Sequence, residues 1–366
     1  MKKIALIFYQ GDWVAGGLWR YGYSLAREFL KIDPKNSYKI IHGRNNPENF
    51  LGLEKQEEII PLRGWGKMLK LPMILQQNNF DVVHVTENAC PFFWCGSYKK
   101  IVNIHDLMPL ALPGAVNKKT FLYYKFFLPR ALKKVDLIIT SSQHSKNDII
   151  RFYGINENKI KIIYHGVPDN YFKEINSEDL EKFKAKYQIN EPYILSVSGI
   201  NFRKNLKTVL LAYSQMDQKI KNTYKIYLVG KAEWEARETR DIIKKLGLEN
   251  NVRILGEVPE GDLPYFYKLA KVFTFPSLYE GFGLPIVEAM AVGCPVISSN
   301  ATCLPEITGG AAILVDPNDI SGWKESMSQV LESNKLANDL IEKGKKRAQQ
   351  FSWQNSARQH LELYFS

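Results

Sequence analysis

The stretch PSLYEGFGLPIVEAMA, residues 276–291, joins a strand pattern to a helix pattern. The apolar run 271–275 before it is typical of a buried strand. A helix is expected to begin at Pro285, because proline suits the first helical turn, and to end at Gly293. Two acids, Glu280 and Glu288, flank the start of this helix. The pattern therefore predicts a strand–loop–helix unit with polar groups at the carboxyl end of the strand.

Such a loop is suited to bind a phosphate next to hydroxyl groups. A helix N-terminus carries a partial positive charge, and its unpaired N–H groups favour anions. Gly281 and Gly283 lack side chains and let a ligand approach the backbone. The amides expected to face it belong to Phe282, Gly283 and Leu284. Glu280 and Glu288 would accept hydrogen bonds from hydroxyls on either side, unless they merely favour the positive end of the helix, which is the alternative.

Size and composition are those of a globular protein with two domains. The chain has 366 residues, of which 45% are hydrophobic and 24% charged. The apolar start is too short for a signal peptide, and no run approaches the ~20 residues of a membrane span. Four cysteines lack metal-ligand spacing and are expected as buried thiols. These features predict a cytoplasmic protein.

The net charge of +11 and pI of about 9.2 are compatible with an anionic substrate, an anionic membrane or nucleic acid. Aromatic residues interleave with basic ones in the segment 121–127. This segment predicts an amphipathic helix with solvated lysines, which could also lie on a membrane surface. Nucleic acid is disfavoured because no recognition motif accompanies the charge. The basic residues are Lys118, Lys119, Lys125, Arg130, Lys133, Lys134, Lys146, Arg151, Lys159 and Lys161.

Strand and helix patterns alternate along both halves of the chain, which predicts α/β domains with parallel sheets. The expected strands are residues 4–9, 82–85, 101–104, 136–140, 161–164, 193–197, 225–229, 252–255, 272–275, 295–298 and 312–315. The expected domains are residues 1–171, with a C-terminal helix 350–366 returning to them, and residues 191–349. Residues 172–190 are polar and are expected to form a linker region with a short helix. In such sheets ligands bind beyond the carboxyl ends of the strands.

The residues 276–291 and Gly293-Cys-Pro-Val-Ile297 resemble glycosyltransferase family 4, retaining enzymes of the GT-B architecture with a Glu-x7-Glu motif. The resemblance implies two Rossmann-like domains that face a central cleft. It implies that Glu280 contacts the transferred sugar and Glu288 the ribose hydroxyls of a nucleotide-sugar donor. It also implies that the amides of Phe282, Gly283 and Leu284 meet the sugar and the diphosphate.

The loop Ser198-Gly-Ile-Asn-Phe-Arg-Lys-Asn205 resembles the donor-binding loop of the same family. Arg203 and Lys204 stand where the family binds the diphosphate, and Gly199 is a donor-binding candidate beside them. Many members have Arg directly after this glycine, where the present chain has Ile200. Arg203 and Lys204 are therefore expected to carry more of the phosphate binding.

Three further positions are assigned by the resemblance. His105, in Asn103-Ile-His-Asp-Leu-Met-Pro109, is expected near the reacting sugar, with Asp106 as an orienting partner or helix cap. Gly16 and Gly17 resemble the glycine loop that lets the first helix approach the phosphates and the acceptor. The backbone near Val258 is expected to pair with the nucleobase. A structural histidine and plain turns are the alternatives at these positions.

The expected function is transfer of a hexose, with retention, from a nucleotide-sugar to a glycan or lipid-linked acceptor for a surface polysaccharide. UDP-glucose is the favoured donor and GDP-mannose the next. No metal or other cofactor is expected, because the chain has no Asp-x-Asp triplet and cations can stabilise the leaving diphosphate. The enzyme could lie at the inner face of the membrane. A nucleotide-sugar 2-epimerase and a non-catalytic nucleotide- or membrane-binding protein are the alternatives.

Overall fold

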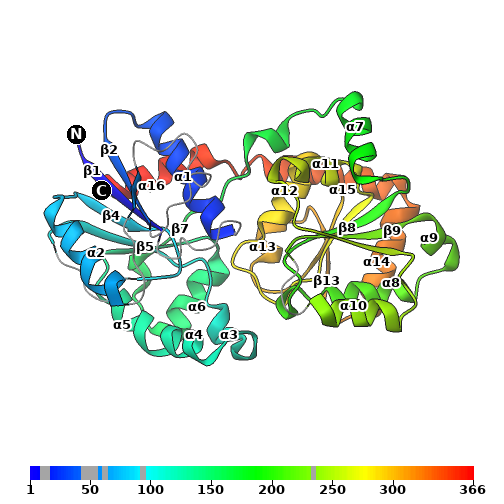
Figure 1. Ribbon diagram of the computed structural model, residues 1–366, viewed down its shortest axis with the longest axis horizontal. Coiled ribbons are helices and arrows are strands. Elements are labelled where there is room, and N and C mark those ends of the chain that lie inside the picture. Colours follow the sequence, from blue (N-terminus) through cyan, green and yellow to red (C-terminus); the bar gives the residue numbers. More distant parts are fainter. Residues whose placement is uncertain (9–16, 43–56, 60–64, 91–95, 232–235) are drawn as a thin grey trace. The chain divides into compact units, whose positions relative to one another are not determined.

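The structure, a computed structural model, describes residues 1–8, 17–42, 57–59, 65–90, 96–231 and 236–366 (Figure 1). The chain divides into two compact units. The first unit comprises residues 1–166 and 352–366, and the second comprises residues 167–351. Of the predicted site residues, Gly16 lies outside the described part of the chain.

The described part of the first unit contains a parallel sheet with the strand order β3-β2-β1-β4-β5-β6-β7. Its strands are β1 Lys3–Phe8, β2 Ser37–His42, β3 Glu57–Ile59, β4 Val82–Val85, β5 Lys99–Asn103, β6 Leu137–Thr140 and β7 Ile160–Ile162. The helices are α1 Gly17–Ile32, α2 Trp65–Gln77, α3 Met108–Ala111, η2 Pro113–Ala115, α4 Lys118–Leu122, η3 Tyr123–Phe127, α5 Leu128–Leu132, α6 Gln143–Tyr153, η4 Glu157–Lys159 and α16 Trp353–Phe365. Residues 4–8 of β1 are buried and apolar on both faces, as expected for a parallel sheet covered by helices on both sides.

The C-terminal helix α16 packs on the first unit, as predicted (Figure 1). Its residues Trp353, Ala357 and Tyr364 belong to the same buried cluster as Phe29 of α1. Ser352 caps the helix by accepting a hydrogen bond from the N–H of Asn355. Helix α16 therefore packs into the same core as β1 and α1.

The second unit contains a parallel sheet with the order β10-β9-β8-β11-β12-β13. Its strands are β8 Tyr193–Val197, β9 Lys225–Val229, β10 Val252–Gly256, β11 Val272–Phe275, β12 Val296–Ser299 and β13 Ile313–Val315. The helices are η5 Asp169–Phe172, α7 Ser177–Tyr187, η6 Phe202–Lys204, α8 Leu206–Ser214, α9 Gln218–Thr223, α10 Ala236–Lys245, η7 Glu260–Asp262, α11 Leu263–Leu269, α12 Leu284–Val292, α13 Leu304–Thr308, α14 Ile320–Glu332 and α15 Asn334–Ala348. The chain runs from β8 to β10 on one side of β8, and then from β11 to β13 on the other.

Residues 172–190 differ from the expected linker region, because they are part of the second unit. Helix α7 places Phe183 against Phe266 of α11, with ring centroids 4.8 Å apart, and Phe183 is buried. Tyr171, before this segment, is buried in the same core. The few apolar residues of a polar segment are therefore enough to attach it, and the second unit begins at Val167 rather than after residue 190.

Candidate active site

The reversal of strand order places a group of loops at one edge of the second sheet. Strands β8 and β11 are neighbours, but the chain leaves them in opposite directions across the sheet. Loops that follow such a pair leave a crevice in which α/β proteins bind ligands. The loop after β8 is residues 198–205, the loop after β11 is residues 276–283, and the loop after β12 is residues 300–303.

Hydrogen bonds connect the first two loops. The backbone N–H of Leu278 donates to the carbonyl of Arg203 at 2.9 Å, and the Arg203 guanidinium donates to the carbonyl of Tyr279 at 3.0 Å. The Asn205 amide donates to the carbonyls of Pro276 and Pro317. Asn205 itself has a positive φ of 51°, a conformation that asparagine tolerates better than most residues. The two predicted parts of the donor site thus form one polar cluster.

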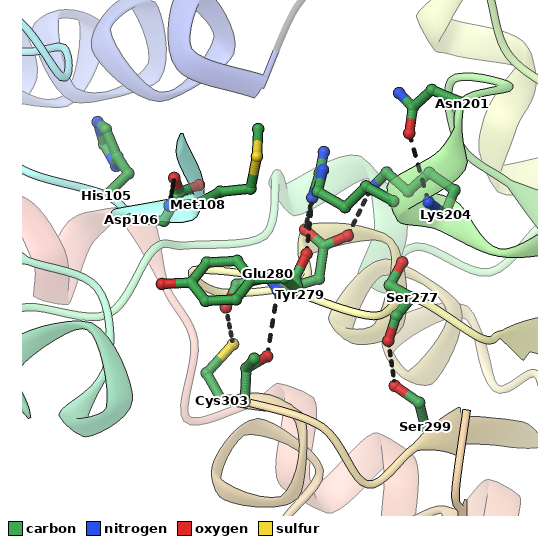
Figure 2. A network of polar contacts seen from close by, with 12 residues as sticks. His105, Asp106, Met108, Asn201, Lys204, Ser277, Tyr279, Glu280, Ser299 and Cys303 are labelled. Carbon is green, nitrogen blue, oxygen red and sulfur yellow. Dashed lines mark hydrogen bonds and ion pairs between the residues drawn. The ribbon is translucent and has the colours of Figure 1, made fainter. Parts of the chain in front are cut away.

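Glu280 forms ion pairs with both predicted phosphate-binding cations (Figure 2). Its Oε1 lies 2.6 Å from Lys204 Nζ, and its Oε2 lies 2.8 Å from Arg203 Nη1. Both Glu280 and Lys204 are buried. Burial alone would raise the pKa of the Glu280 carboxyl, but the two cations outweigh burial and lower the pKa to about 2.

These three side chains carry a net charge of +1 at neutral pH. Two cations held by one carboxylate can receive an anion such as a diphosphate, because a positive charge remains after the pairing. The structure therefore brings Arg203, Lys204 and Glu280 together, as the sequence had grouped them.

The helix after the acid loop begins one residue earlier than expected. Helix α12 is Leu284–Val292, with Pro285 in its first turn and Gly293 as the C-terminal cap. Gly283 caps its N-terminus with a φ of +91°, which favours glycine. A Cβ atom on Gly283 would lie 2.8 Å from Leu304 Cδ2, so a side chain at this position would require Leu304 to shift. Gly281 and Phe282 are buried beside it, and Leu284 is half-buried.

Glu288 lies on the second turn of α12 and is almost fully buried. Its Oε2 accepts a hydrogen bond from the hydroxyl of Tyr267 at 3.1 Å. Tyr267 belongs to α11 and was not singled out from the sequence, in which nothing distinguishes it from other core tyrosines. The carboxylate of Glu288 is thus held by a buried hydroxyl in this structure.

The remaining predicted donor-binding residues lie in several loops. Gly199 is half-buried in the loop after β8, beside Gly230 after β9. A Cβ on Gly230, whose φ is +138°, would lie 2.1 Å from the carbonyl oxygen of Ser198, so these two loops are in close contact. Val258 follows β10 and packs on the main core of the second unit. Gly17 is the first residue of α1, in the first unit.

His105 lies in the first unit, directly after β5, and is buried. Its Nε2 is 2.9 Å from the carbonyl of Thr86, and its Nδ1 is 3.2 Å from His165 Nε2. Burial lowers the pKa of His105 to about 4, so the ring is neutral at pH 7. Asp106 accepts a hydrogen bond from the N–H of Met108, the first residue of α3, at 3.1 Å (Figure 2), whereas Leu107 occupies the N-cap position of this helix.

Two features are absent from the part of the chain that the structure describes. Within this part of the chain, no three His, Cys, Asp or Glu side chains are grouped so as to hold a metal ion. The described helices also include none that is both long enough and apolar enough to cross a membrane.

Both halves of the chain match models of known protein families. The model of Glycosyltransferase Family 4 matches residues 15–171, and that of Glycosyl transferases group 1 matches residues 177–347. The chain is 33% identical over 287 residues to O-antigen chain mannosyltransferase B of Escherichia coli, an alignment covering 78% of this chain and 72% of that protein. It is 29% identical over 275 residues to the serotype-specific mannosyltransferase WbdA of Escherichia coli, which covers 73% of this chain and 33% of WbdA.

A solved structure shows the same fold. Anabaena Alr3699/HepE in complex with UDP and glucose superposes with a TM-score of 0.79 over 99% of both chains, at 20% identity. The likeness confirms the predicted GT-B architecture with its two Rossmann-like units. Together with the alignment to the mannosyltransferase, these matches show that the chain is a glycosyltransferase and belongs to glycosyltransferase family 4.

Proposed function

We propose that this glycosyltransferase moves a mannosyl group from GDP-mannose to a glycan or lipid-linked acceptor, with retention of the anomeric configuration and without a metal ion. The observation that carries the proposal is the ion-paired cluster of half-buried Arg203 with buried Lys204 and Glu280, beside the N-terminus of α12. A leaving diphosphate gains negative charge as the sugar–phosphate bond breaks. Fixed cations and N–H groups outside bulk water stabilise that charge by several kcal/mol for each strong donor.

The carboxylates take the hydroxyl-binding roles in this proposal. Glu280 exchanges one of its cation contacts for a hydroxyl of the sugar when the diphosphate takes over Arg203 and Lys204. Glu288 exchanges its contact with Tyr267 for the ribose. Gly199, Val258 and the amides of Phe282, Gly283 and Leu284 line the remaining donor path in the second unit. These assignments rest on the family motif and on the proximity of Glu280 to both cations.

His105 is proposed as a neutral hydrogen-bonding group near the reacting sugar. Its lowered pKa keeps the imidazole uncharged. In this proposal one ring nitrogen exchanges its contact with Thr86 or His165 for a hydroxyl of the sugar. Retention is proposed through attack of the acceptor on the face that the diphosphate leaves, with a phosphate oxygen taking the acceptor proton. Glu280 is a poor candidate for a covalent intermediate, because in this proposal one of its oxygens stays paired with a cation and the other binds a sugar hydroxyl.

Mannose is placed before glucose for one reason. The two relatives described above, at 33% and 29% identity, are named as mannosyltransferases, whereas the HepE structure with UDP and glucose shows the fold alone at 20% identity. This reverses the order that we expected from the sequence. The names of the relatives also favour an acceptor in the synthesis of a surface polysaccharide.

We further propose that the first unit binds the surface of an anionic membrane, where a lipid-linked acceptor would lie. The helical run α4-η3-α5 is anchored by the buried side chains of Tyr124, Leu128 and Leu132. Leu122, Phe126 and Phe127 are 46, 43 and 50% exposed on the same run. Residues 107–135 contain six Lys or Arg and no Asp or Glu. Exposed aromatic residues between cations suit insertion at a lipid headgroup layer.

A donor panel tests the proposal. GDP-mannose and UDP-glucose are each incubated with the enzyme in excess chelator, and slow hydrolysis to the free sugar is measured, since hydrolysis needs no acceptor. We expect faster hydrolysis of GDP-mannose, with unchanged anomeric configuration in the first product. Lys204→Ala should reduce kcat/KM by roughly 10²–10³-fold. Lys207→Ala, an exposed lysine three residues further on α8, is the matched control.

Three results would contradict the proposal. Equal activity of the Lys204 and Lys207 variants would show that turnover does not depend on the cation cluster. Activity that is lost in chelator and restored by magnesium or manganese would show that the enzyme needs a metal ion. Release of an epimerised sugar from the donor alone would point to a nucleotide-sugar epimerase instead.

A further inference from the structure

The loop between β12 and α13 holds both backbone polar groups of Glu280. The N–H of Glu280 donates to Thr302 Oγ1 at 3.1 Å, and its carbonyl accepts a hydrogen bond from Cys303 Sγ at 3.1 Å (Figure 2). Two consecutive side chains of one loop thus fix a single residue of another loop. Neither Thr302 nor Cys303 has a part in the donor site described above.

Thr302 adopts a backbone conformation that is unfavourable for its residue type. Its φ is +54°, in the left-handed region that β-branched residues rarely occupy. Such outliers persist where the surrounding structure requires them, and they cluster at functional sites. Here the conformation accompanies a hydroxyl that accepts from the Glu280 N–H and a following thiol that donates to the Glu280 carbonyl.

Cys303 is suited to act as a buried donor. Its side chain is fully buried, and burial together with the nearby Glu280 raises the pKa of its thiol well above the usual value. The thiol therefore keeps its proton at neutral pH. The next residue, Leu304, contacts the position where Gly283 has no side chain. One short loop thus contacts the acid loop at Glu280 and again at Gly283.

We propose that Thr302 and Cys303 are positioning residues that hold Glu280 where its carboxylate can engage Arg203 and Lys204, and through them the donor. This inference deepens the proposed function and rests on it for the effect on turnover. A displacement of Glu280 would misalign the carboxylate and both cations together, because all three share ion pairs. Misplacement by about 1 Å can reduce turnover by about 100-fold.

Paired variants separate positioning from simple packing. Thr302→Ala and Cys303→Ala remove the polar groups, whereas Thr302→Ser and Cys303→Ser retain a hydroxyl. We expect kcat for the donor to fall about 10–100-fold in both alanine variants with little change in KM, and to recover largely in the serine variants. Cys294→Ala is the matched control, because Cys294 is a second buried thiol of the same unit with only long contacts of 3.6 and 3.9 Å to carbonyls.

A double-mutant cycle with Glu280→Gln provides a readout that does not need activity. Melting temperatures are measured for wild type, Thr302→Ala, Glu280→Gln and the double variant. If Thr302 acts through the Glu280 carboxylate, the decrease in melting temperature of the double variant is clearly smaller than the sum of the decreases of the two single variants. Additive losses, or alanine variants with the kcat of Cys294→Ala, would overturn the inference. If wild type processed no nucleotide-sugar, the proposed function would fail, and the melting cycle would still decide the positioning role.

Discussion

Glu280 takes part in both ion pairs of the candidate site in the second unit. It is buried, yet it stays ionised because Arg203 and Lys204 approach within 2.8 and 2.6 Å. Replacing one member of such a buried group leaves the others unpaired, which costs more than the group contributes as a whole. The three residues should therefore respond to substitution as a unit, and not as independent surface charges.

Glu280→Gln should destabilise the protein more at pH 7 than at pH 3. The folded-state pKa of about 2 lies below the usual value, so the carboxylate stabilises the fold above pH ~4.5 and this stability is lost as the pH falls toward 2. A shift of this size corresponds to roughly 3 kcal/mol. Urea unfolding of wild type and variant at pH 7 and pH 3 measures the difference, which should shrink in acid. The exposed Glu257→Gln is the control, and a pH-independent difference would contradict the ion-pair account.

The residue types of the donor site could be read from the sequence, but not their mutual contacts. Arg203 and Glu280 are 77 positions apart, and only the neighbouring placement of β8 and β11 brings them together. The motif likewise gave no indication of Thr302 and Cys303, because a hydrogen bond to a backbone group leaves no residue pattern. Tyr267 was missed for a similar reason, since its hydroxyl meets Glu288 across two helices.

At the scale of elements, strong local signals gave accurate bounds. The strands β4, β8, β9 and β11 have the predicted bounds, because each is a short apolar run with clear ends. Strand β2 was not predicted, since Ser37–His42 mixes polar and apolar residues and becomes a strand by pairing with β1. Helix α7 was foreseen as a helix but not as part of a core, because a single buried phenylalanine carries its packing.

Helix α12 depends on the conformation of the glycine before it. Gly283→Ala should destabilise the second unit by about 1–2 kcal/mol from the backbone alone, because φ is +91°. The added Cβ would also meet Leu304 Cδ2 at 2.8 Å, which adds to the destabilisation. The same change should lower donor turnover, since it moves the amides at the helix start. Thermal unfolding and hydrolysis assays measure both effects. Gly261→Ala is the control, with no heavy atom within 4 Å of its Cβ and no positive φ, and equal behaviour of the two variants would refute the prediction.

At the scale of the whole molecule, the two units differ in their ionisable groups. The core of the first unit contains a histidine cluster, formed by His84, His105, His165 and His360. Tyr21 connects it, with its hydroxyl 2.8 Å from His360 Nε2 and accepting from Asn103 Nδ2 at 2.9 Å. His84 contacts Asn103 and Tyr364, so β4, β5, α1 and α16 share one buried network. At the candidate site of the second unit, the neighbouring cations stabilise the charged form of Glu280. In the core of the first unit, burial instead destabilises the charged form of the histidines.

The first unit should therefore lose stability in a different pH range from the second. Burial lowers the pKa of His105 and His360 to about 4, and lowers the pKa values of His84 and His165 as well. Because these values lie below the usual 6.5, the unfolded chain binds protons first. Stability is complete above pH 6.5 and falls as the pH drops toward 4, by roughly 3 kcal/mol for each of His105 and His360. In the second unit, the stability contributed by Glu280 begins to decrease only below pH ~4.5.

Calorimetry at pH 7.5, 6.0 and 5.0 tests this difference between the units. We expect one unfolding transition to move to lower temperature across this range while the other stays nearly constant. His360→Gln keeps a neutral polar group opposite Tyr21 and removes one titrating ring, so its moving transition should depend less on pH than that of wild type. Transitions that shift in parallel, or a variant with the wild-type pH dependence, would contradict the prediction that the buried histidines make the first unit acid-sensitive. The last turns of the chain would then have no part in the acid sensitivity of the unit that they complete.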